Sequence, residues 1–405
     1  MRTGFHRSFF YDRMELSVFV MRIIISSLTY PLLNGVTVSI NTSVDELLKR
    51  GHEARIVAPD YKKGKVRPEH VLIPSSLLIH KVAVNLLGKE ERVFRAGSEK
   101  RVAKAAEEFG PDIYWLHSVT WAPNAFENHM LKSGKPKVLF YHTLVEEYGR
   151  IYAGSPGAYV MRKRTKALGN KMDIIMTPSK MMKRKLEKYG VKVPIRVIPT
   201  GIRMPERSFT KKEVRERFGI PPKKKILLYL GRLSTEKNLE LLLEALKEVR
   251  KKEKEAVLLL VGPGDIEDIK KQADKMGIGE SVFCPGPLEK KEARRVYGGC
   301  DIFVFSSQTE TQGLVVGEAM LAGLPVVALR SPVQKEIYPE GRSVVVKKKK
   351  NFADNVVRLL LDDDKRKRIA KKGKEYAEER FSVEKMAESH LKVFEEVIKK
   401  QNKRK

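Results

Sequence analysis

Cysteine is nearly absent from the sequence: Cys284 and Cys300 are the only two among 405 residues. They form no C-x-x-C pair, which excludes a disulfide framework and a thiolate zinc site and is typical of a protein of the reducing cytoplasm. Residues with the spacing of metal ligands are missing too, as is a Ser-His-Asp arrangement. We therefore expect neither a structural disulfide nor a bound metal.

Long apolar runs are also missing. The longest near the start, 16–25, contains Arg22 and is half of the roughly 20 residues that a transmembrane helix needs. Asp12 and Glu15 interrupt the basic region before it, which does not fit a secretory signal. We expect no transmembrane helix and no signal peptide, and we interpret residues 1–20 as an N-terminal extension.

Acidic residues are in deficit, because 80 Lys and Arg stand against 50 Asp and Glu and leave a formal charge of +30. A surplus of this size favours contact with a polyanion, either nucleic acid or an anionic membrane face. The alternative is the lysine-rich composition of a heat-tolerant proteome. That composition also enriches Glu, so it explains the charge density better than the imbalance.

Short β-branched runs alternate with segments of helical periodicity along almost the whole chain. This alternation predicts βαβ units and parallel sheets. Two of the predicted helices are 36–50, closed by Gly51, and 180–189, closed by Gly190. The predicted strands are 21–26, 54–58, 112–116, 137–141, 173–177, 195–198, 226–230, 256–261, 282–284, 301–306 and 325–329.

The alternation weakens between residues 204 and 225, where Pro205, a capping box from Thr210 to Glu213 and a Pro-Pro turn occur. We therefore predict an α/β chain of two Rossmann-like, doubly wound parallel-sheet domains that face each other across a cleft. Ligands of such domains bind beyond the carboxyl ends of the strands. The predicted ranges are 21–205 for the N-terminal domain, 206–225 for a linker, 226–380 for the C-terminal domain and 381–405 for a C-terminal helix with a basic tail.

The segment 301–323 is the most informative in the chain. Glu318 would be the single charge in an otherwise apolar helix, and a buried carboxylate needs an ion pair or hydrogen bonds. Its partner is either an internal arginine or a ligand rich in hydroxyl donors, such as a ribose. Gly313 leaves the amides at the start of this helix open to a phosphate. Glu310 lies in the loop after the strand, where site residues gather, unless it is a solvated acid.

Two cations flank a second strand-to-helix turn, which begins at Gly231. The amino end of a helix disfavours positive charge, so Arg232 and Lys237 fit best if an anion binds there. A diphosphate would suit them, with a bidentate contact from Arg232 and a point charge from Lys237. The alternative is that both are solvated surface bases.

Other glycine turns narrow the choice of nucleotide. Gly262 follows a strand, but Glu267 occupies the last glycine position of the dinucleotide fingerprint, which argues against NAD and for a tight turn. The absence of a G-x-x-x-x-G-K-[ST] pattern excludes a P-loop ATPase. In the first domain, Gly35 opens the first helix and offers its free amides to a phosphate from the opposite side of the cleft.

Two histidines, His117 and His142, follow predicted strands in the first domain. Lone histidines at such positions are usually structural, whereas two at cleft-facing strand ends indicate a functional site. Glu146 and Glu147 follow His142 and place acids behind its imidazole. Both interpretations remain open at this point.

These motifs resemble those of retaining GT-B glycosyltransferases of family 4, over residues 21 to about 400. The resemblance implies transfer of a sugar from a nucleotide diphosphate with retention and without a bound metal or cofactor. It also implies an N-terminal acceptor domain, a C-terminal donor domain, a hinge near 203–225 and a C-terminal helix that packs back on the N-terminal domain. The motifs that carry it are Glu310-x7-Glu318, Gly231-Arg232-x4-Lys237-Asn238 and Asn34-Gly35-Val36.

By this resemblance, Glu318 holds the donor ribose, Glu310 contacts the hydroxyls of the donor sugar and His142 lies beside that sugar. Arg232 and Lys237 would neutralise the leaving diphosphate, and such preorganised charge lowers a barrier strongly. Gly317 is smaller than the residue that is usual before the second glutamate. Further residues expected at the donor are Gly35, Gly231, Gly262, Gly313, Leu314 and Val315, and those expected at the acceptor or sugar are His117 and Glu146.

Within the family, the segments 141–148, 198–201 and 309–313 resemble the diacylglycerol glucosyltransferase branch. Residues 151–203 add physical support, because they hold 13 Lys and Arg and two acids, a net charge of +11 that would attract anionic headgroups. Val160-Met161 and Ala167-Leu168, one heptad apart among cations, fit an interfacial helix. A solvated helix of an ordinary soluble enzyme is the alternative.

We therefore predict a cytoplasmic enzyme, attached peripherally to the inner face of the cell membrane. It would move a hexose, glucose from UDP-glucose, to a lipid hydroxyl such as that of a diacylglycerol. The alternatives are a soluble sugar or polysaccharide acceptor, a GT-B-like epimerase, and a nucleic-acid-binding protein. The last lacks a basic-aromatic nucleic-acid module, so we expect no specific nucleic-acid partner.

Overall fold

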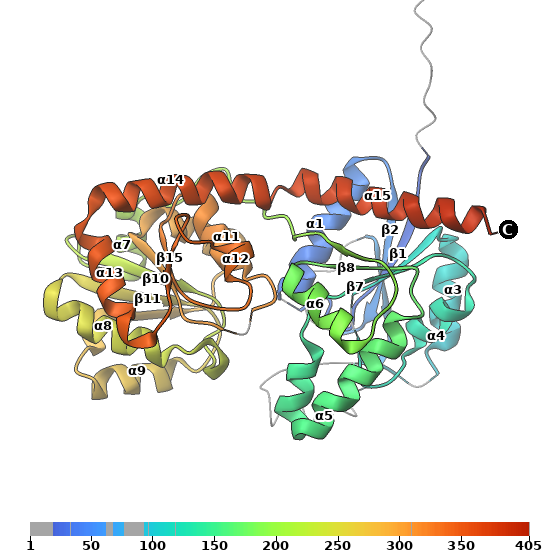
Figure 1. Ribbon diagram of the computed structural model, residues 1–405, viewed down its shortest axis with the longest axis horizontal. Coiled ribbons are helices and arrows are strands. Elements are labelled where there is room, and N and C mark those ends of the chain that lie inside the picture. The colour runs from blue at the N-terminus through green and yellow to red at the C-terminus, as the bar shows by residue number, and fades with distance from the viewer. Residues whose placement is uncertain are drawn as a thin grey trace, which may run out of the picture.

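The computed structural model describes residues 19–32, 34–61, 68–76, 93–95, 97–117, 119–308 and 310–404. Residues 1–18 of the predicted N-terminal extension and Thr309 lie outside these ranges. Two parallel β-sheets stand side by side with helices around each, as Figure 1 shows. This architecture confirms the predicted pair of Rossmann-like domains.

The N-terminal sheet has seven strands within the described residues, in the order β3-β2-β1-β6-β7-β8-β9. Its strands are β1 (Arg22–Ser26), β2 (Glu53–Pro59), β3 (His70–Ile73), β6 (Ile113–Leu116), β7 (Lys137–Phe140), β8 (Ile174–Thr177) and β9 (Ile195–Val197). A small antiparallel pair joins β4 (Ser75–Ser76) to β5 (Val93–Phe94). The helices of this domain are α1 (Gly35–Lys49), α3 (Glu99–Phe109), α4 (Ala125–Lys132), α5 (Val145–Gly169) and α6 (Lys180–Tyr189).

The described C-terminal sheet has six strands in the order β12-β11-β10-β13-β14-β15. They are β10 (Lys225–Leu230), β11 (Ala256–Val261), β12 (Val282–Gly286), β13 (Ile302–Phe305), β14 (Val326–Leu329) and β15 (Val344–Val346). The α-helices of this domain are α7 (Lys211–Phe218), α8 (Glu240–Lys252), α9 (Ile266–Lys275), α10 (Lys290–Val296), α11 (Leu314–Leu321), α12 (Gln334–Ile337), α13 (Phe352–Leu361) and α14 (Asp363–Arg380), and the chain ends in α15 (Val383–Asn402). Four 3-10 turns are η1 (Thr235–Lys237), η2 (Gly279–Ser281), η3 (Tyr297–Gly299) and η4 (Lys349–Asn351).

Every predicted strand is present, and its ends differ from the prediction by two residues or fewer. The prediction missed the two-residue strands β4 and β5 and also β3 and β15, which are short strands at the sheet edges and are only partly buried. The sequences of β3 (HVLI) and β15 (VVV) are apolar, but four and three residues are too short a run for periodicity to identify a strand. Local caps explain the helix boundaries: α6 begins at the N-cap Ser179 and ends at Gly190, which adopts φ 86°.

The segment predicted as a linker contains α7, whose capping box forms both of its expected hydrogen bonds. α7 packs against η3 of the C-terminal domain, where Gly298 and Gly299 allow the close approach. A Cβ at Gly299 would lie 2.2 Å from a methyl carbon of Val214 in α7. The packing of α7 therefore requires glycine at this contact.

The chain returns to its first domain at the end. α14 covers the C-terminal domain and α15 continues over the N-terminal domain, so that the two run end to end along the upper edge of Figure 1. α15 packs against α1, and its Met386 and Phe394 join a core with Trp115 and Phe140. In the described ranges, no helix combines the length and the apolar character that crossing a membrane requires.

α5 departs from the interfacial helix that the heptad pattern predicted. The helix is interrupted at Ala153 and Gly154, and Met161 and Leu168 are buried inside the protein. Tyr159 and Val160 are instead large apolar side chains that α5 exposes among its described residues, at 52% and 45% exposure. The heptad prediction was wrong for Met161 and Leu168, because the helix uses that face to pack on its own domain.

Candidate active site

The strand order reverses in each sheet, between β1 and β6 and between β10 and β13. Doubly wound domains bind ligands outside the carboxyl ends of the strands at such reversals. In the C-terminal sheet, Gly231 and Arg232 directly follow β10, and the loop that holds Glu310 follows β13. The topology therefore brings the two predicted motifs to one edge of the sheet.

Lys237 and Glu310 form an ion pair at this edge. Lys237 Nζ lies 2.7 Å from Glu310 Oε1, although the residues are 73 positions apart, and their side chains are 13% and 17% exposed. Ser306 Oγ donates a 2.7 Å hydrogen bond to the carbonyl of Lys237 and ties the two loops together. The pair is thus preorganised yet reachable, so an incoming phosphate can compete with Glu310 for the ammonium group.

Arg232 lies in the same turn but is more exposed. Its guanidinium, with 42% of the side chain exposed, is 3.1 Å from Glu236 Oε1. The Tyr229 hydroxyl donates to the Arg232 carbonyl over 3.0 Å and holds the backbone of the turn. The bidentate contact with a diphosphate remains a prediction for this residue.

Glycines near Arg232 allow the loop after β10 and the loop after β11 to approach each other closely. Gly231 and Gly262 have φ of 153° and 150°, and a Cβ at Gly262 would lie 1.8 Å from the Gly231 carbonyl oxygen. At Gly264 a Cβ would lie 2.0 Å from the Leu233 carbonyl oxygen. No side chain fits at either position, so the tight-turn interpretation of this segment agrees with the structure. Contact of Gly231 or Gly262 with a donor stays a prediction.

Two helix starts meet across the domains. Gly313, with φ 67°, precedes α11, and Gly35 begins α1, whose N-cap Asn34 accepts a 2.9 Å hydrogen bond from the Thr37 amide. A Cβ on Gly35 would be 3.7 Å from Leu314 Cδ1, in ordinary van der Waals contact. The amides expected to bind phosphate therefore approach from both domains, as the sequence suggested.

Glu318 has an internal partner. Its Oε1 accepts hydrogen bonds from Nε and NH2 of Arg294 at 2.8 and 2.6 Å, and the Tyr297 hydroxyl donates to Oε2 at 3.0 Å. Arg294 and Glu318 side chains are 10% and 8% exposed. Of the two partners left open above, the structure shows the arginine. The argument that a buried Glu318 needs a partner is thus met by the first alternative, and its contact with a ribose rests on the resemblance alone.

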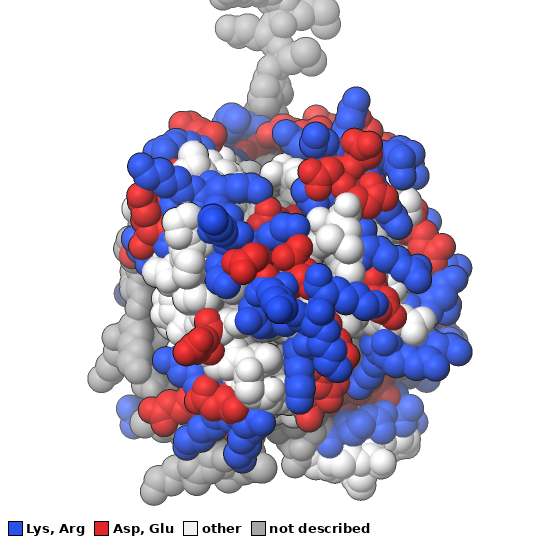
Figure 2. All heavy atoms as spheres, turned by 90° about the vertical axis from the view of Figure 1, so that its left-hand side faces the viewer, with Lys and Arg blue, Asp and Glu red and all other residues white. Residues whose placement is uncertain are grey.

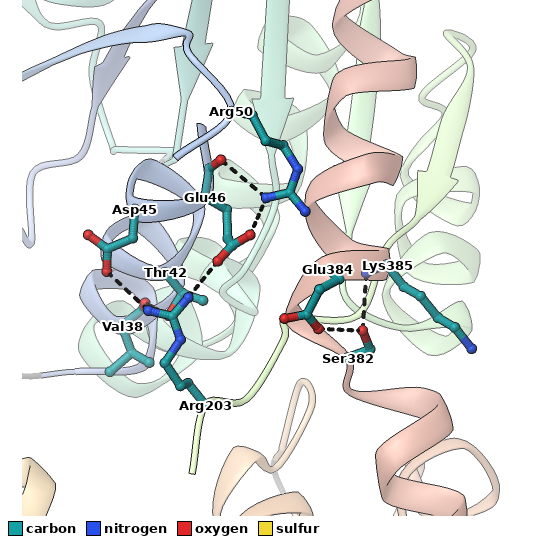
Figure 3. A network of polar contacts seen from close by, with 9 residues as sticks. All are labelled: Val38, Thr42, Asp45, Glu46, Arg50, Arg203, Ser382, Glu384 and Lys385. Atoms are coloured by element: carbon teal, nitrogen blue, oxygen red, sulfur yellow. Dashed lines mark hydrogen bonds and ion pairs between the residues drawn. The ribbon is translucent and has the colours of Figure 1, made fainter. Parts of the chain in front are cut away.

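Arg294 also reaches the segment that joins the domains. Its NH1 donates a 2.7 Å hydrogen bond to the Arg203 carbonyl, and Arg203 NH2 lies 2.5 Å from Oε1 of the buried Glu46. Figure 3 shows Arg203 between Asp45 and Glu46 of α1, with Arg50 on the other side of Glu46. A continuous polar chain thus links Glu318 to the N-terminal domain.

The structure brings the two predicted histidines together. His117 Nδ1 and His142 Nε2 are 2.8 Å apart in a hydrogen bond, and the His142 ring stacks on Phe140 at a centroid distance of 4.0 Å. His390 of α15 packs against Trp115 beside them, and neither of its ring nitrogens has a hydrogen-bond partner among the residues that the structure describes. His142 is 8% exposed, so the pair lies at the edge of the core and not in an open cleft.

Acid should destabilise the protein through this cluster. Burial, reinforced by His390, lowers the pKa of His142 to about 3, and burial lowers the pKa of His390 to about 3. Because unfolded histidines titrate near 6.5, stability is lost as the pH falls below that value toward 3. His390→Phe should reduce this loss by about 1.4 kcal/mol per pH unit, measured by urea denaturation between pH 7 and 4.5. An unchanged slope would contradict the neutral state assigned to His390.

Glu146 was expected near the acceptor or sugar, but it is 7% exposed and surrounded by partners. The Tyr189 hydroxyl donates to it, and Arg150, Lys185 and Arg162 approach within 3.5, 3.6 and 3.7 Å. These contacts join α5 to α6. The structure therefore gives Glu146 a structural role, because its oxygens are occupied by side chains of its own domain.

A cavity of about 350 Å³ lies between the domains and includes Glu310 in its wall. The N-terminal domain contributes residues of α6 and the start of α5, and the C-terminal domain contributes the loops after β13 and β14. The lining residues are Leu144, Glu147, Met181, Arg184, Lys185, Lys188, Gln308, Glu310 and Pro332. Two of the predicted elements, α6 and the Glu310 loop, thus share one hollow.

Several interdomain residues were not predicted from the sequence. Gln312 exchanges two 3.0 Å hydrogen bonds with the backbone of Thr200, and Glu336 accepts from the amides of Lys180 and Met181 at 2.7 and 3.1 Å. Their partners lie far away in the sequence, so no local pattern points to them. For Arg294 the sequence holds an indirect indication, since Glu318 is an acid within an apolar helix and requires some partner.

No three His, Cys, Asp or Glu side chains in the described part of the chain are placed to hold a metal ion. The polar groups at the edge of the C-terminal sheet are a lysine, an arginine, a carboxylate and free helix amides. Such groups suit a phosphate-bearing ligand that also presents hydroxyls.

Family models match both halves of the chain. The model described as "Glycosyltransferase Family 4" covers residues 33–204, and that described as "Glycosyl transferases group 1" covers residues 210–376. Alpha-monoglucosyldiacylglycerol synthase of Streptococcus pneumoniae is 32% identical over 330 residues, which span 77% of this chain and 72% of that protein. The synthase of the same name from Acholeplasma laidlawii is 23% identical over 95% of this chain and 99% of its own.

A solved structure shares the fold. Anabaena Alr3699/HepE, crystallised in complex with UDP and glucose, aligns with a TM-score of 0.73 at 16% identity over 93% of this chain and 100% of that one. Identity this low establishes the architecture alone. With family models on both domains and a relative above 30% identity, the chain belongs to glycosyltransferase family 4 and is an enzyme of the GT-B fold.

Proposed function

We propose that the protein transfers a hexose, glucose from UDP-glucose, to the hydroxyl of a membrane lipid such as a diacylglycerol, with retention and without a bound metal. The observation that carries this proposal is the Lys237–Glu310 pair, which lies at the strand-order reversal; its Glu310 lines a cavity shared with the N-terminal domain. Relatives named alpha-monoglucosyldiacylglycerol synthases support the lipid, and the neighbouring structure with UDP and glucose supports the donor.

The positive groups around the Lys237–Glu310 pair would offset the negative charge that develops on the diphosphate during sugar transfer. As the bond between sugar and phosphate lengthens, Lys237 would move from Glu310 to the leaving diphosphate, and Arg232 and the amides near Gly313 and Gly35 would add to its stabilisation. The acceptor hydroxyl would attack on the face that the phosphate leaves, and its proton would pass to the departing phosphate oxygen.

Recognition of the donor would fall to the other predicted residues. Glu310, once released by Lys237, would accept hydrogen bonds from sugar hydroxyls, and Glu318 would hold the ribose while Arg294 fixes its position. His142 would lie beside the sugar, oriented by its hydrogen bond to His117. Because His142 is held neutral by burial, it would act by hydrogen bonding and not as a charge.

The N-terminal domain offers the surface for attachment to the inner face of the membrane. On α5, exposed Tyr159 and Val160 lie next to Arg162 and Lys163, whose cations lie 6.0 and 5.4 Å from the Tyr159 ring. Apolar and cationic side chains together suit an anionic bilayer surface. At the opposite end of the molecule, Figure 2 shows acidic side chains scattered among the basic ones.

Vesicle sedimentation tests this surface. Lys163→Gln/Lys166→Gln should lower partitioning onto vesicles with anionic lipid by about 30-fold, at roughly 1 kcal/mol per cation, and rising salt should release the wild type. Lys271→Gln/Lys275→Gln on α9 is the matched control with the same loss of charge. Equal effects of the two variants, or a wild type that stays in the supernatant throughout, would count against the membrane surface.

The donor and the acceptor are tested with a panel of radiolabelled nucleotide sugars and extracted lipids. We expect label from UDP-glucose in the organic phase. Label that stays in the aqueous phase on a sugar or polysaccharide would point to a soluble acceptor, and turnover of the donor without an acceptor would point to an epimerase.

A further inference from the structure

Three cations of α6 face the cavity between the domains: Arg184, Lys185 and Lys188. Glu310, the residue proposed to contact the transferred sugar, lines the same cavity from the C-terminal domain. The cavity therefore has a cationic side on the N-terminal domain and the donor loop on the C-terminal domain. A group bound between them would be next to the reacting centre.

The charges of this cavity do not cancel. Lys185 Nζ is 3.0 Å from Glu147 Oε1, and Glu310 is occupied by Lys237 at 2.7 Å. Arg184 and Lys188 form no ion pair with any residue in the described ranges. Two positive charges are thus left without a partner, which is the charge that a phosphate group would balance.

α6 is held in place from the other domain. The two carboxylate oxygens of Glu336 accept hydrogen bonds from the Lys180 and Met181 amides, at the start of α6, and Arg380 lies 3.6 Å from the same carboxylate. Glu336 belongs to α12 of the C-terminal domain. This contact fixes the cationic row opposite the Glu310 loop, so the cavity has a defined shape.

Apolar side chains complete the wall. Leu144 and Met181 come from the N-terminal domain and Pro332 from the C-terminal domain. A small inorganic anion would leave these surfaces without a contact, whereas a phosphate on an apolar body would cover both kinds of surface. The lining therefore favours an amphiphilic ligand.

We propose that this cavity binds the phosphate group of a phosphate-bearing lipid acceptor, held by Arg184 and Lys188. The proposal rests on the proposed function and differs from it in one respect: a diacylglycerol has no phosphate, so the acceptor becomes a membrane lipid that carries a phosphate near the reacting hydroxyl. Arg184 supplies a bidentate contact and Lys188 a point charge. The donor diphosphate keeps its own cations, Arg232 and Lys237.

Calorimetric binding to the full chain with UDP saturating tests this site, because UDP then occupies the donor side. The probes are dihexanoyl phosphatidic acid, dihexanoylglycerol as the same lipid without phosphate, and inorganic phosphate. Arg184→Gln/Lys188→Gln should weaken phosphatidic acid binding by about tenfold or more and leave dihexanoylglycerol binding unchanged. The control Lys183→Gln/Lys192→Gln removes the same charge outside the cavity and should change it less than about twofold.

Equal weakening in the two variants, or none in either, would overturn the site. Loss of UDP affinity in Arg184→Gln/Lys188→Gln would overturn it as well, since the cavity would then belong to the donor. If inorganic phosphate binds as tightly as phosphatidic acid, the ligand of the site is free phosphate and the proposal of a lipid ligand is wrong. Because these are binding measurements, a failure to transfer sugar to lipids would refute the proposed function and leave the phosphate site standing.

Discussion

Lys237→Met is expected to lower kcat for sugar transfer by about 10²–10³-fold, with a much smaller change in KM for the donor. The ammonium group is paired with Glu310 at 2.7 Å before reaction and would be needed most when charge builds on the leaving phosphate. An interaction that strengthens in the transition state affects kcat more than ground-state binding. Steady-state kinetics with UDP-glucose and a lipid acceptor measure this split.

Two further variants make the test of Lys237 specific. Glu310→Gln should also abolish transfer, because the neutral amide can neither hold Lys237 nor accept hydrogen bonds as a carboxylate does. Lys252→Met removes a lysine from an exposed pair with Asp354 in the same domain and should retain normal kcat. Full activity of Lys237→Met with its fold intact would remove the pair from the active site.

Arg294→Met is expected to destabilise the protein by about 3–5 kcal/mol, because it leaves the Glu318 carboxylate buried without its charged partner. Glu318 is 8% exposed on its side chain, so water cannot replace the two hydrogen bonds that Arg294 donates. The Arg203 carbonyl would lose a 2.7 Å hydrogen bond as well. Urea denaturation followed by circular dichroism at pH 7 measures the loss.

The double variant Arg294→Met/Glu318→Leu should recover most of that stability, since apolar side chains of similar volume can replace a buried ion pair. Arg232→Met, which breaks the exposed pair with Glu236, should cost less than about 1 kcal/mol. A double variant no more stable than Arg294→Met would contradict the buried pair as the cause. UDP affinity of the double variant then tests the proposed ribose contact apart from the structural one.

Gly317 shows how a departure from the family pattern can be structural. A Cβ at this position would lie 2.6 Å from Ile202 Cδ1 and 3.0 Å from the Phe381 ring. Those residues belong to the segment that joins the domains and to the junction of α14 and α15. The small residue before Glu318 therefore allows the interdomain segments to pack against α11.

The apolar positions of α5 show that a sequence pattern can also predict the wrong surroundings for a side chain. Val160-Met161 and Ala167-Leu168 have the spacing of an interfacial helix, yet Met161 and Leu168 pack inside the protein. Spacing reveals which residues share a face of a helix, but the neighbouring helices determine whether that face meets protein, lipid or water. The same limit applied to His142, whose pKa is lowered by burial and in part by His390 of α15, at the far end of the chain.

The doubly wound fold, the strand ends and the loop positions of Arg232, Lys237 and Glu310 were predictable, because periodicity, caps and turns depend on neighbouring residues. The partners of these side chains were not. That Glu318 meets Arg294, that Lys237 meets Glu310 and that Glu336 meets the start of α6 depends on how distant elements pack. A charge within an apolar segment of the sequence indicates that a partner is required, while the identity of the partner follows from three-dimensional proximity, which local patterns do not encode.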